Sequence, residues 1–285
     1  MNPKIGVCFI TQNRPDFLRK SLHTFHKALN NHDDIHIVVV QDGGLHPYAG
    51  KILGEVDGLY SRQDLPNDSA ILYSRDNIGV GCAKNMGLRY LQSLDCDYFF
   101  VIEDDITCKD SEVFNQYIKA FQETGIHHFM YGYHGPANKT DGSGGSPNPR
   151  LVIEYNNDVR VALNLHCVGA FCFYTRQCLE KVGLMDPAYF NAAEHIDHSF
   201  NIYQHDLGTP FWWWADLANS PDLLDEQACS EKNSSIRPRS DWSQNVKNGW
   251  ERYKQKWGQY PTENFNMSQE NVLQHLKHLR AQRNK

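Results

Sequence analysis

The sequence lacks a long apolar run and an excess of positive charge. No hydrophobic stretch approaches the roughly 18 residues that a membrane-spanning helix needs. The first residues also lack the basic and then apolar segments of a secretory signal. The net charge of −6 disfavours a nucleic-acid-binding face, although a total charge hides local patches. We therefore expect a soluble, cytoplasmic protein without a transmembrane segment.

Cysteine pairs at metal-binding or redox spacing are also missing. The eight cysteines are scattered, and no two of them form a Cys-x-x-Cys pair. Several, including Cys8 and Cys172, stand in apolar, strand-like surroundings, where a thiol is usually buried and reduced. We therefore expect neither a zinc site nor a disulfide framework, and a reducing cytoplasm fits this pattern.

Two common nucleotide-binding loops are absent. The nearest match to G-x-G-x-x-G, at residues 79–84, has Lys84 in place of the third glycine and follows the third expected strand rather than the first. No G-x-x-x-x-G-K-[ST] loop occurs. A dinucleotide-binding Rossmann domain and a P-loop nucleotide site are therefore not expected.

The first hundred residues alternate between strand and helix patterns. Short apolar runs predict strands at residues 4–10, 35–40, 70–74 and 98–102. Helical spacing of apolar residues predicts helices that begin near Pro15 and that extend over residues 83–91. Strands joined by helical crossovers imply a parallel, twisted α/β sheet, and 285 residues suffice for one large domain of this kind.

The second half of the chain is less regular. Residues 134–150 are rich in glycine, asparagine, serine and proline and predict a lid or binding loop, and the polar residues 225–245 are a second candidate active-site loop. The patterns further predict a strand at 169–174, a short helix at 175–182 and an amphipathic helix at 268–285. We expect one domain over residues 1–225, with a C-terminal extension, 226–285, packed on it.

The most informative feature is a run of three carboxylates, Glu103, Asp104 and Asp105, directly after the expected strand at 98–102. Removing unpaired charges from water is costly, so the run should lie at the end of the strand rather than inside it. Open α/β sheets bind ligands at the carboxyl ends of their strands. Carboxylates grouped there suit Mg²⁺ or Mn²⁺ bound together with a substrate's phosphates. A solvated acidic turn is the plainer alternative.

Five segments follow one another in an order that resembles GT-A glycosyltransferases of the large family 2 type. They are residues 9–14, 39–43, 77–87, 103–105 and 168–186. The third segment matches N-x-G-x-x-x-A-[RK]-N-x-G, and the fourth occupies the place of the D-x-D motif, spelled Glu-Asp-Asp. The resemblance covers residues 4–217. It implies an α/β fold of the GT-A type, with a mostly parallel mixed sheet flanked by helices.

The resemblance implies a nucleotide-sugar donor, with UDP as its nucleotide. It assigns donor contacts to Thr11, Asn13, Arg14, Asp42, Asn77, Lys84 and Asp104. Asp42 would accept a hydrogen bond from the uracil ring. Lys84, near a helix N-terminus, would add positive charge for the diphosphate; a solvated helix residue is the alternative for it.

The resemblance also implies a divalent ion, Mn²⁺ or Mg²⁺, that neutralises charge on the diphosphate leaving group. Asp105 would hold the ion, with Asp104 or Glu103 contributing through water. Related enzymes often have a further histidine ligand after a later strand, but residues 210–219 contain none. Asp216 is therefore a candidate ligand, and Asn219 is an alternative to it.

The catalytic base is open between neighbouring residues. Inverting members of the family spell this segment Gly-Glu-Asp-x-Asp, and aligning Asp197 with the last aspartate puts His195 in the place of the catalytic one. Glu194 or His195 could remove the acceptor proton, His195 with a pKa suited to neutral pH. We expect inversion, although a similar segment in retaining polypeptide GalNAc-transferases leaves retention open. Acidic residues at a helix N-terminus are the plainer alternative.

The predicted reaction moves a sugar from a UDP-sugar to an acceptor hydroxyl. A saccharide, a glycolipid, a protein and a modified nucleic-acid base are all open as acceptors. The alternatives are a metal-dependent nucleotidyltransferase or phosphohydrolase on the same sheet topology, and a non-catalytic sugar-nucleotide-binding module. Residues 11–16 lack the glycine-rich loop of nucleotidyltransferases. The tryptophans at 212–214 predict either a sugar-stacking face or core packing.

Overall fold

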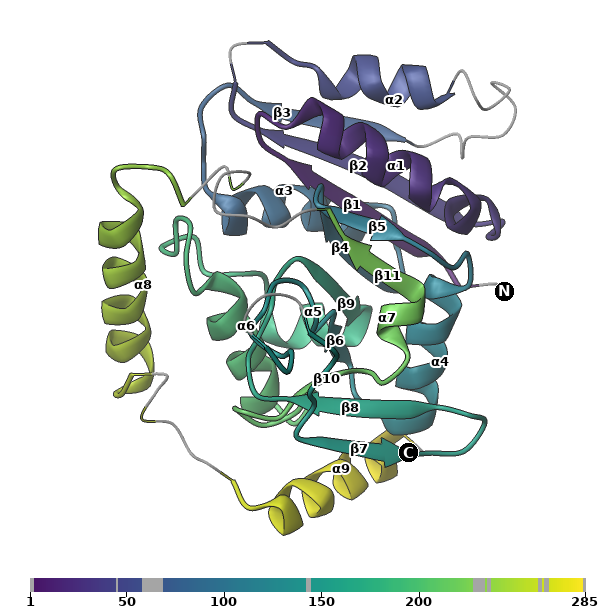
Figure 1. Ribbon diagram of the computed structural model, residues 1–285, viewed down its shortest axis with the longest axis vertical. Coiled ribbons are helices and arrows are strands. Elements are labelled where there is room, and N and C mark those ends of the chain that lie inside the picture. The colour runs from purple at the N-terminus through teal and green to yellow at the C-terminus, as the bar shows by residue number, and fades with distance from the viewer. Residues whose placement is uncertain are drawn as a thin grey trace.

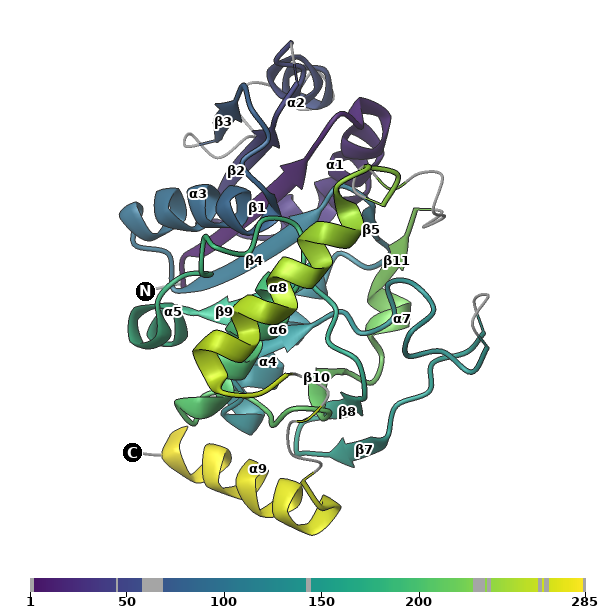
Figure 2. The ribbon, with the colours of Figure 1, turned by 90° about the vertical axis from the view of Figure 1, so that its left-hand side faces the viewer.

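The computed structural model describes residues 3–44, 46–57, 69–141, 145–227, 234, 237–260, 263 and 267–283. Figures 1 and 2 show a central sheet between helices, with a smaller sheet beside it and the last helix across one end. Within the described residues, no helix combines the length and the apolar surface needed to cross a membrane.

A six-stranded sheet forms the centre, in the order β3-β2-β1-β4-β9-β6 (Figure 1). Its strands are β1 (Ile5–Thr11), β2 (Ile35–Asp42), β3 (Ala70–Ser74), β4 (Tyr98–Glu103), β6 (His128–Met130) and β9 (Phe171–Thr175). The first four strands pair in parallel, and β9 pairs antiparallel with both β4 and β6. The predicted mostly parallel mixed sheet is confirmed.

Helices cover both faces of this sheet, which is why every residue of β1 and β2 is buried. The first half contains α1 (Pro15–Asn30), α2 (Ala49–Asp57), α3 (Val80–Ser93) and α4 (Val113–Thr124). Leu88 and Leu91 of α3 belong to one buried cluster, while Phe25 of α1 and Phe114 of α4 belong to the other. The two clusters lie on opposite faces of the sheet, because alternate side chains of β1 enter each of them.

The predicted elements of the first half are confirmed, with shifts of a few residues at their ends. Helices α2 and α4 were not predicted. In the second half, the short helix is α5 (Arg176–Val182), capped by the Thr175 hydroxyl, which accepts a hydrogen bond from the Cys178 backbone N–H. The predicted tail helix is α9 (Gln269–Arg283).

The second half adds two small antiparallel sheets. One has the order β10-β8-β7, from β10 (Trp214–Leu217), β8 (Arg160–Asn164) and β7 (Leu151–Glu154); the other pairs β11 (Leu224–Glu226) with β5 (Ile106–Cys108). Helices α6 (Glu194–Gln204), α7 (Ser220–Leu223) and α8 (Trp242–Trp257) complete the fold. The described part of residues 134–150 is a loop with one bridge, between Lys139 and Pro147.

Both C-terminal helices lie on the preceding chain. Helix α8 runs alongside α6 (Figure 2), and Lys256 and Trp257 each contact Asp197. Helix α9 lies against α4 and buries Val272 and Leu279. The division into a domain over residues 1–225 and an extension over 226–285 stays a prediction.

Candidate active site

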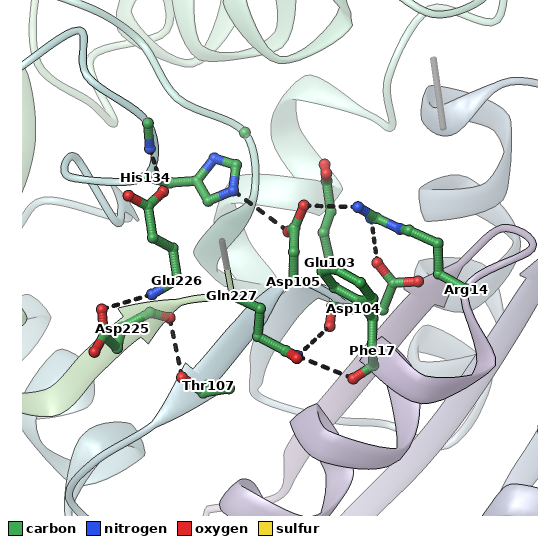
Figure 3. Close-up of polar contacts among 12 residues, drawn as sticks. Arg14, Phe17, Glu103, Asp104, Asp105, Thr107, His134, Asp225, Glu226 and Gln227 are labelled. Atoms are coloured by element: carbon green, nitrogen blue, oxygen red, sulfur yellow. Dashed lines mark hydrogen bonds and ion pairs between the residues drawn. The ribbon is translucent and has the colours of Figure 1, made fainter. Parts of the chain in front are cut away.

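The three carboxylates lie at the carboxyl end of β4, as the sequence predicted (Figure 3). Glu103 is the last residue of β4 and pairs in register with Ile10 of β1. Asp104 is fully buried and Asp105 is only 5 % exposed, so the run is not a solvated acidic turn. Buried carboxylates need partners, and the surrounding loops supply them.

Arg14, which caps the amino end of α1, joins the two aspartates. Its Nη1 atom lies 3.1 Å from Asp105 Oδ2, and its Nη2 atom donates to Asp104 Oδ1. The Thr11 hydroxyl donates to Asp104 Oδ2 over 2.6 Å. Burial, opposed by Arg14, raises the pKa of Asp104 to about 7. Because both oxygens of Asp104 are engaged by protein groups, this residue positions Arg14 and Thr11 instead of facing a donor, contrary to its expected role.

Asp105 faces the loop that follows β6. Its Oδ1 atom is buried and lies 3.4 Å from His134 Nε2, longer than a short hydrogen bond (Figure 3). Burial would raise the pKa of Asp105, but His134 and Arg14 outweigh it and lower the pKa to about 2. Asp105 is therefore ionised, and its carboxylate lies next to the imidazole of His134. Sequence reasoning sought a histidine near residue 215 and missed this one, although it opens the loop expected to cover the site.

Glu226 of β11 binds the loop that follows β6 through two hydrogen bonds. Its carboxylate accepts hydrogen bonds from the Gly135 backbone N–H (2.5 Å) and from Lys139 Nζ (2.8 Å). The Gln227 side chain donates to the backbone carbonyls of Asp104 (2.9 Å) and Phe17 (3.0 Å), as Figure 3 shows. The polar segment predicted at 225–245 thus begins beside the carboxylates, while residues 228–233 and 235–236, with Cys229, lie outside the described residues.

A pocket opens next to the carboxylates. It is lined by Ile10, Thr11, Gln12, Arg14, Asp42, Val80, Glu103 and Asn191. Four of these residues are among the predicted donor or metal contacts. The structure therefore brings these four predicted residues together, although up to 92 positions separate them in the sequence, from Thr11 to Glu103.

Two buried amide groups, one in the pocket lining and one next to it, lack a hydrogen-bond partner among the described residues. The Asp42 carboxylate accepts the Ile78 backbone N–H over 2.7 Å, and burial raises the pKa of Asp42. Asn77 turns its Oδ1 atom to the Gly79 backbone N–H (2.8 Å). The Nδ2 atoms of Asn77 and Asn191 are buried and have no hydrogen-bond partner among the described residues. Such orphaned donors fit an electron-rich ligand. Asn13 lies in the turn after β1, with a positive φ of 53°.

Lys84 differs from both expectations for it. Its side chain is completely buried, so it is not a solvated helix residue. The Nζ atom lies 2.7 Å from Glu103 Oε1, 2.8 Å from the Gly169 carbonyl oxygen and 3.6 Å from Glu194 Oε1. Its three donors face protein oxygens, so the expected contact with a diphosphate is not supported. Lys84 instead joins the acidic run to the start of α6.

The predicted catalytic segment splits into two parts. Glu194 is 3 % exposed, and its Oε1 atom lies 3.1 Å from His195 Nδ1. Burial would raise the pKa of Glu194, but His195 and Lys84 lower it to about 2. Asp197 faces the other way, where its carboxylate accepts hydrogen bonds from Lys256 (2.6 Å), Trp257 (2.7 Å) and Tyr189 (3.1 Å). Asp197 therefore anchors α8, and its expected catalytic role is not supported.

Asp216 is also engaged elsewhere. One of its oxygens accepts hydrogen bonds from the Tyr117 hydroxyl and the Leu217 backbone N–H, and the other from the Ser220 hydroxyl and the Gly132 backbone N–H. The predicted metal set of Asp105, Glu103 and Asp216 is therefore not assembled. Across the described ranges, no group of three His, Cys, Asp or Glu side chains is arranged to hold a metal ion.

The three tryptophans at residues 212–214 differ in burial. Trp213 and Trp214 are buried in the core, as the plainer alternative held. Arg150 lies 3.7 Å from the centre of the Trp213 ring. Trp212 is only partly buried and has a positive φ of 67°, so it is the one of the three that a sugar could reach.

Comparison with protein families identifies the class that this fold and site define. The model of glycosyl transferase family 2 matches residues 6–183, more than half of the chain. The chain belongs to this family. The predicted class, a family 2-like glycosyltransferase with a GT-A fold, is confirmed.

Individual relatives agree with this assignment. An uncharacterized glycosyltransferase, R363, of Acanthamoeba polyphaga mimivirus is 25 % identical over 246 residues, which are 82 % of this chain and 85 % of the viral protein. Mannosyltransferase PcManGT of Pyrobaculum calidifontis, solved with GDP-Man and Mn²⁺, superposes with a TM-score of 0.54 at 14 % identity; the match covers 74 % of this chain and only 55 % of PcManGT. TarS 1–349 of S. aureus, solved with UDP-GlcNAc, has a TM-score of 0.54 at 12 % identity, over 97 % of this chain and 71 % of that one.

Proposed function

We propose that the protein transfers a sugar from a UDP-sugar to an acceptor hydroxyl, with a divalent metal ion as cofactor. The observation that carries the proposal is the position of Asp105. This ionised carboxylate lies at the carboxyl end of β4, beside the pocket that Thr11, Arg14 and Asp42 line. Open α/β sheets bind their ligands at such an edge.

The donor would occupy this pocket. The Asp42 carboxylate accepts hydrogen bonds and is suited to the N3–H of uracil, while Arg14 supplies positive charge for phosphates. The unpartnered Nδ2 atom of Asn191, which lines the pocket, offers a further donor. UDP is preferred because TarS 1–349, whose match covers 97 % of this chain, was solved with a UDP-sugar. GDP is the alternative, since PcManGT was solved with GDP-Man.

The residues around Asp105 fit Mn²⁺ or Mg²⁺ bound with the donor. Asp105 Oδ1 is a buried oxygen without a close hydrogen bond, and His134 Nε2 lies beside it. A carboxylate oxygen suits Mn²⁺ or Mg²⁺, and the donor's phosphate oxygens would add ligands. When bound, the ion would neutralise charge on the diphosphate leaving group. Glu103, paired with Lys84, would contribute at most through water.

Inversion at the sugar carbon is our proposal for the stereochemistry, and the four acceptor classes stay open. The cytoplasmic location also stays a proposal. It is supported by the seven described cysteines, Cys8, Cys82, Cys96, Cys108, Cys167, Cys172 and Cys178, all of which are free thiols.

Thermal unfolding with UDP and Mn²⁺ tests the proposal. A ligand that binds only the folded state stabilises it by about 2.7 kcal/mol at a hundred times its Kd. We expect UDP to raise the melting temperature when Mn²⁺ is present and to have little effect after chelation. GDP in place of UDP tests the choice of nucleotide.

Two substitutions make the test specific to the carboxylate. Asp105→Asn should abolish the joint effect of UDP and Mn²⁺ while the protein stays folded. Asp222→Asn, at an exposed aspartate of α7, is the matched control and should behave as the wild type. A metal-independent response to UDP, or an undiminished response in Asp105→Asn, would refute the metal assignment.

A further inference from the structure

We propose that His195 is the general base of the transfer reaction and that Glu194 positions it. This assignment rests on the proposed function, because it names the group that accepts the acceptor's proton. It stands on the geometry at the start of α6, where the Glu194 carboxylate meets the His195 ring at 3.1 Å.

Glu194 itself is poorly placed to be the base. Its side chain is 4 % exposed, and its Oε1 atom already faces two cationic or donor groups, His195 Nδ1 and Lys84 Nζ. A carboxylate held in this way is a weak proton acceptor and has no open path to an incoming hydroxyl. Both neighbours instead fix its orientation.

His195 has the complementary properties. A carboxylate can only accept a hydrogen bond, so the contact with Glu194 requires the proton to be on Nδ1. The Nε2 atom is then the unprotonated, basic nitrogen of the neutral ring. The side chain is 23 % exposed, and within the described ranges Nε2 has no hydrogen-bond partner. This is the arrangement by which a carboxylate orients a catalytic histidine in other enzymes.

Gly169 holds the ring from its other side. A Cβ atom on Gly169 would lie 2.8 Å from Cγ of His195, so the ring packs directly on the glycine backbone. The carbonyl oxygen of Gly169 accepts a hydrogen bond from Lys84 over 2.8 Å. The ring is therefore fixed by a neighbour that is itself tied to Lys84.

Lys84 connects this pair to the donor pocket. Its Nζ atom contacts both Glu194 and Glu103, and Glu103 lines the pocket. The contacts from His195 to Glu194, from Glu194 to Lys84 and from Lys84 to Glu103 therefore link the ring to a wall of that pocket. In an inverting transfer, the base must lie on the side of the sugar opposite to the diphosphate. His195 meets one part of this requirement, because it comes from α6 and not from the acidic run at residues 103–105 that faces the diphosphate in the proposed function.

The acceptor O–H gives its proton to His195 Nε2 while its oxygen forms a bond to the anomeric carbon. The bond from that carbon to the diphosphate oxygen breaks, and its electron pair leaves with UDP. Glu194 stabilises the imidazolium, which then releases a proton to solvent.

Hydrolysis of a UDP-sugar, with water in place of the acceptor, tests this assignment. The substrate is whichever of UDP-glucose, UDP-galactose and UDP-N-acetylglucosamine the wild type hydrolyses fastest with Mn²⁺. We expect His195→Ala to lower kcat about 100-fold or more, the range usual for losing a general base. KM for the donor should change less than about threefold, since His195 is absent from the residues that line the pocket.

Three further variants separate catalysis from structure. His195→Gln keeps a polar side chain and should be as inactive as His195→Ala. Glu194→Gln should lower kcat about tenfold or more, because an amide neither fixes the Nδ1 proton as firmly nor stabilises the imidazolium. His205→Ala, at the other end of α6, is the matched control and should retain wild-type kinetics. Added imidazole should restore part of the activity of His195→Ala, which a purely structural defect would not permit.

The possible failures can be told apart. If the wild type does not bind UDP with Mn²⁺, the proposed function fails. If the wild type binds UDP and hydrolyses the UDP-sugar, but His195→Ala and His195→Gln both keep kcat within threefold, only the assignment of His195 is overturned.

Discussion

The two halves of the chain build the site in different ways. In the first half, Thr11, Asp42 and Glu103 stand at the ends of parallel strands, where the sheet itself fixes their positions. In the second half, His134 comes from a loop and His195 from the first turn of a helix. The first half therefore supplies a donor pocket that the fold dictates, while the second supplies groups that depend on contacts between distant segments.

The halves meet at two points close to the pocket. Lys84 of α3 lies between Glu103 and Glu194, and Gly79 lies directly against the backbone of Phe190. Substitutions of Lys84 and Gly79 therefore test whether the contacts between the two halves can be weakened while the central sheet stays folded.

The largest effect is expected for Lys84→Met. Removing the ammonium leaves the buried Glu194 and the partly buried Glu103 without their shared cation. Breaking a buried ion pair from one side typically costs about 3–5 kcal/mol. Urea unfolding should show a loss of about that size. Lys27→Met, at an exposed position of α1, is the control and should change the free energy of unfolding by less than about 0.5 kcal/mol. An equally small change in Lys84→Met would show that Lys84 does not join the halves.

Gly79→Ala should be the next most damaging change. Gly79 has a φ of +89°, and a Cβ atom there would lie 2.1 Å from the Phe190 carbonyl oxygen. Gly183 has a φ of +77° but open space around it, so Gly183→Ala isolates the cost of the backbone conformation. Such strain costs about 1–3 kcal/mol. In urea unfolding, Gly79→Ala should lose at least about 2 kcal/mol more than Gly183→Ala, since backbone atoms must move. Equal losses of stability in the two variants would mean that the chain around Gly79 and the chain around Phe190 can move apart without a cost in free energy.

The same contrast explains what could be predicted from the sequence. The strands and helices of the first half follow from local patterns, and the carboxylates at the end of β4 follow from the cost of burying charge. Lys84 was expected to contact the donor, Asp197 to take part in catalysis and Asp216 to bind metal, because a family motif gives a residue's place in the chain but not its partners. Their partners are up to 110 residues away, as Glu194 is from Lys84. His134 was missed because nothing local distinguishes a histidine at the start of a glycine-rich loop.

Asp216→Asn tests one of these corrections. The substitution replaces an acceptor oxygen by an NH₂ group that faces donors, which should lower the free energy of unfolding by about 2 kcal/mol. If Asp216 is structural, the Mn²⁺ concentration that gives half-maximal UDP-sugar hydrolysis should stay within about twofold of the wild type. A metal requirement raised tenfold or more in folded protein would restore Asp216 as a ligand.

The smallest expected effect is an acid sensitivity where β6 contacts α6 of the second half. His128 is buried on β6, stacked on Tyr174 at 4.5 Å, and its Nε2 atom contacts the Ser199 hydroxyl. Burial lowers the pKa of His128 to about 3. Below pH 6.5 the unfolded chain therefore binds a proton that the folded chain does not, and stability falls as the pH falls.

Between pH 6.5 and pH 5 this linkage amounts to about 1.5 kcal/mol for one histidine. His128→Gln removes the titrating group, so its free energy of unfolding should fall by about that much less than the wild type's over this range, whatever its absolute stability. His23→Gln, at an exposed position of α1, should keep the wild-type slope. If His128→Gln also keeps that slope, acid sensitivity arises elsewhere, and the edge strand β6 is as resistant to protonation as the strands that carry the donor pocket.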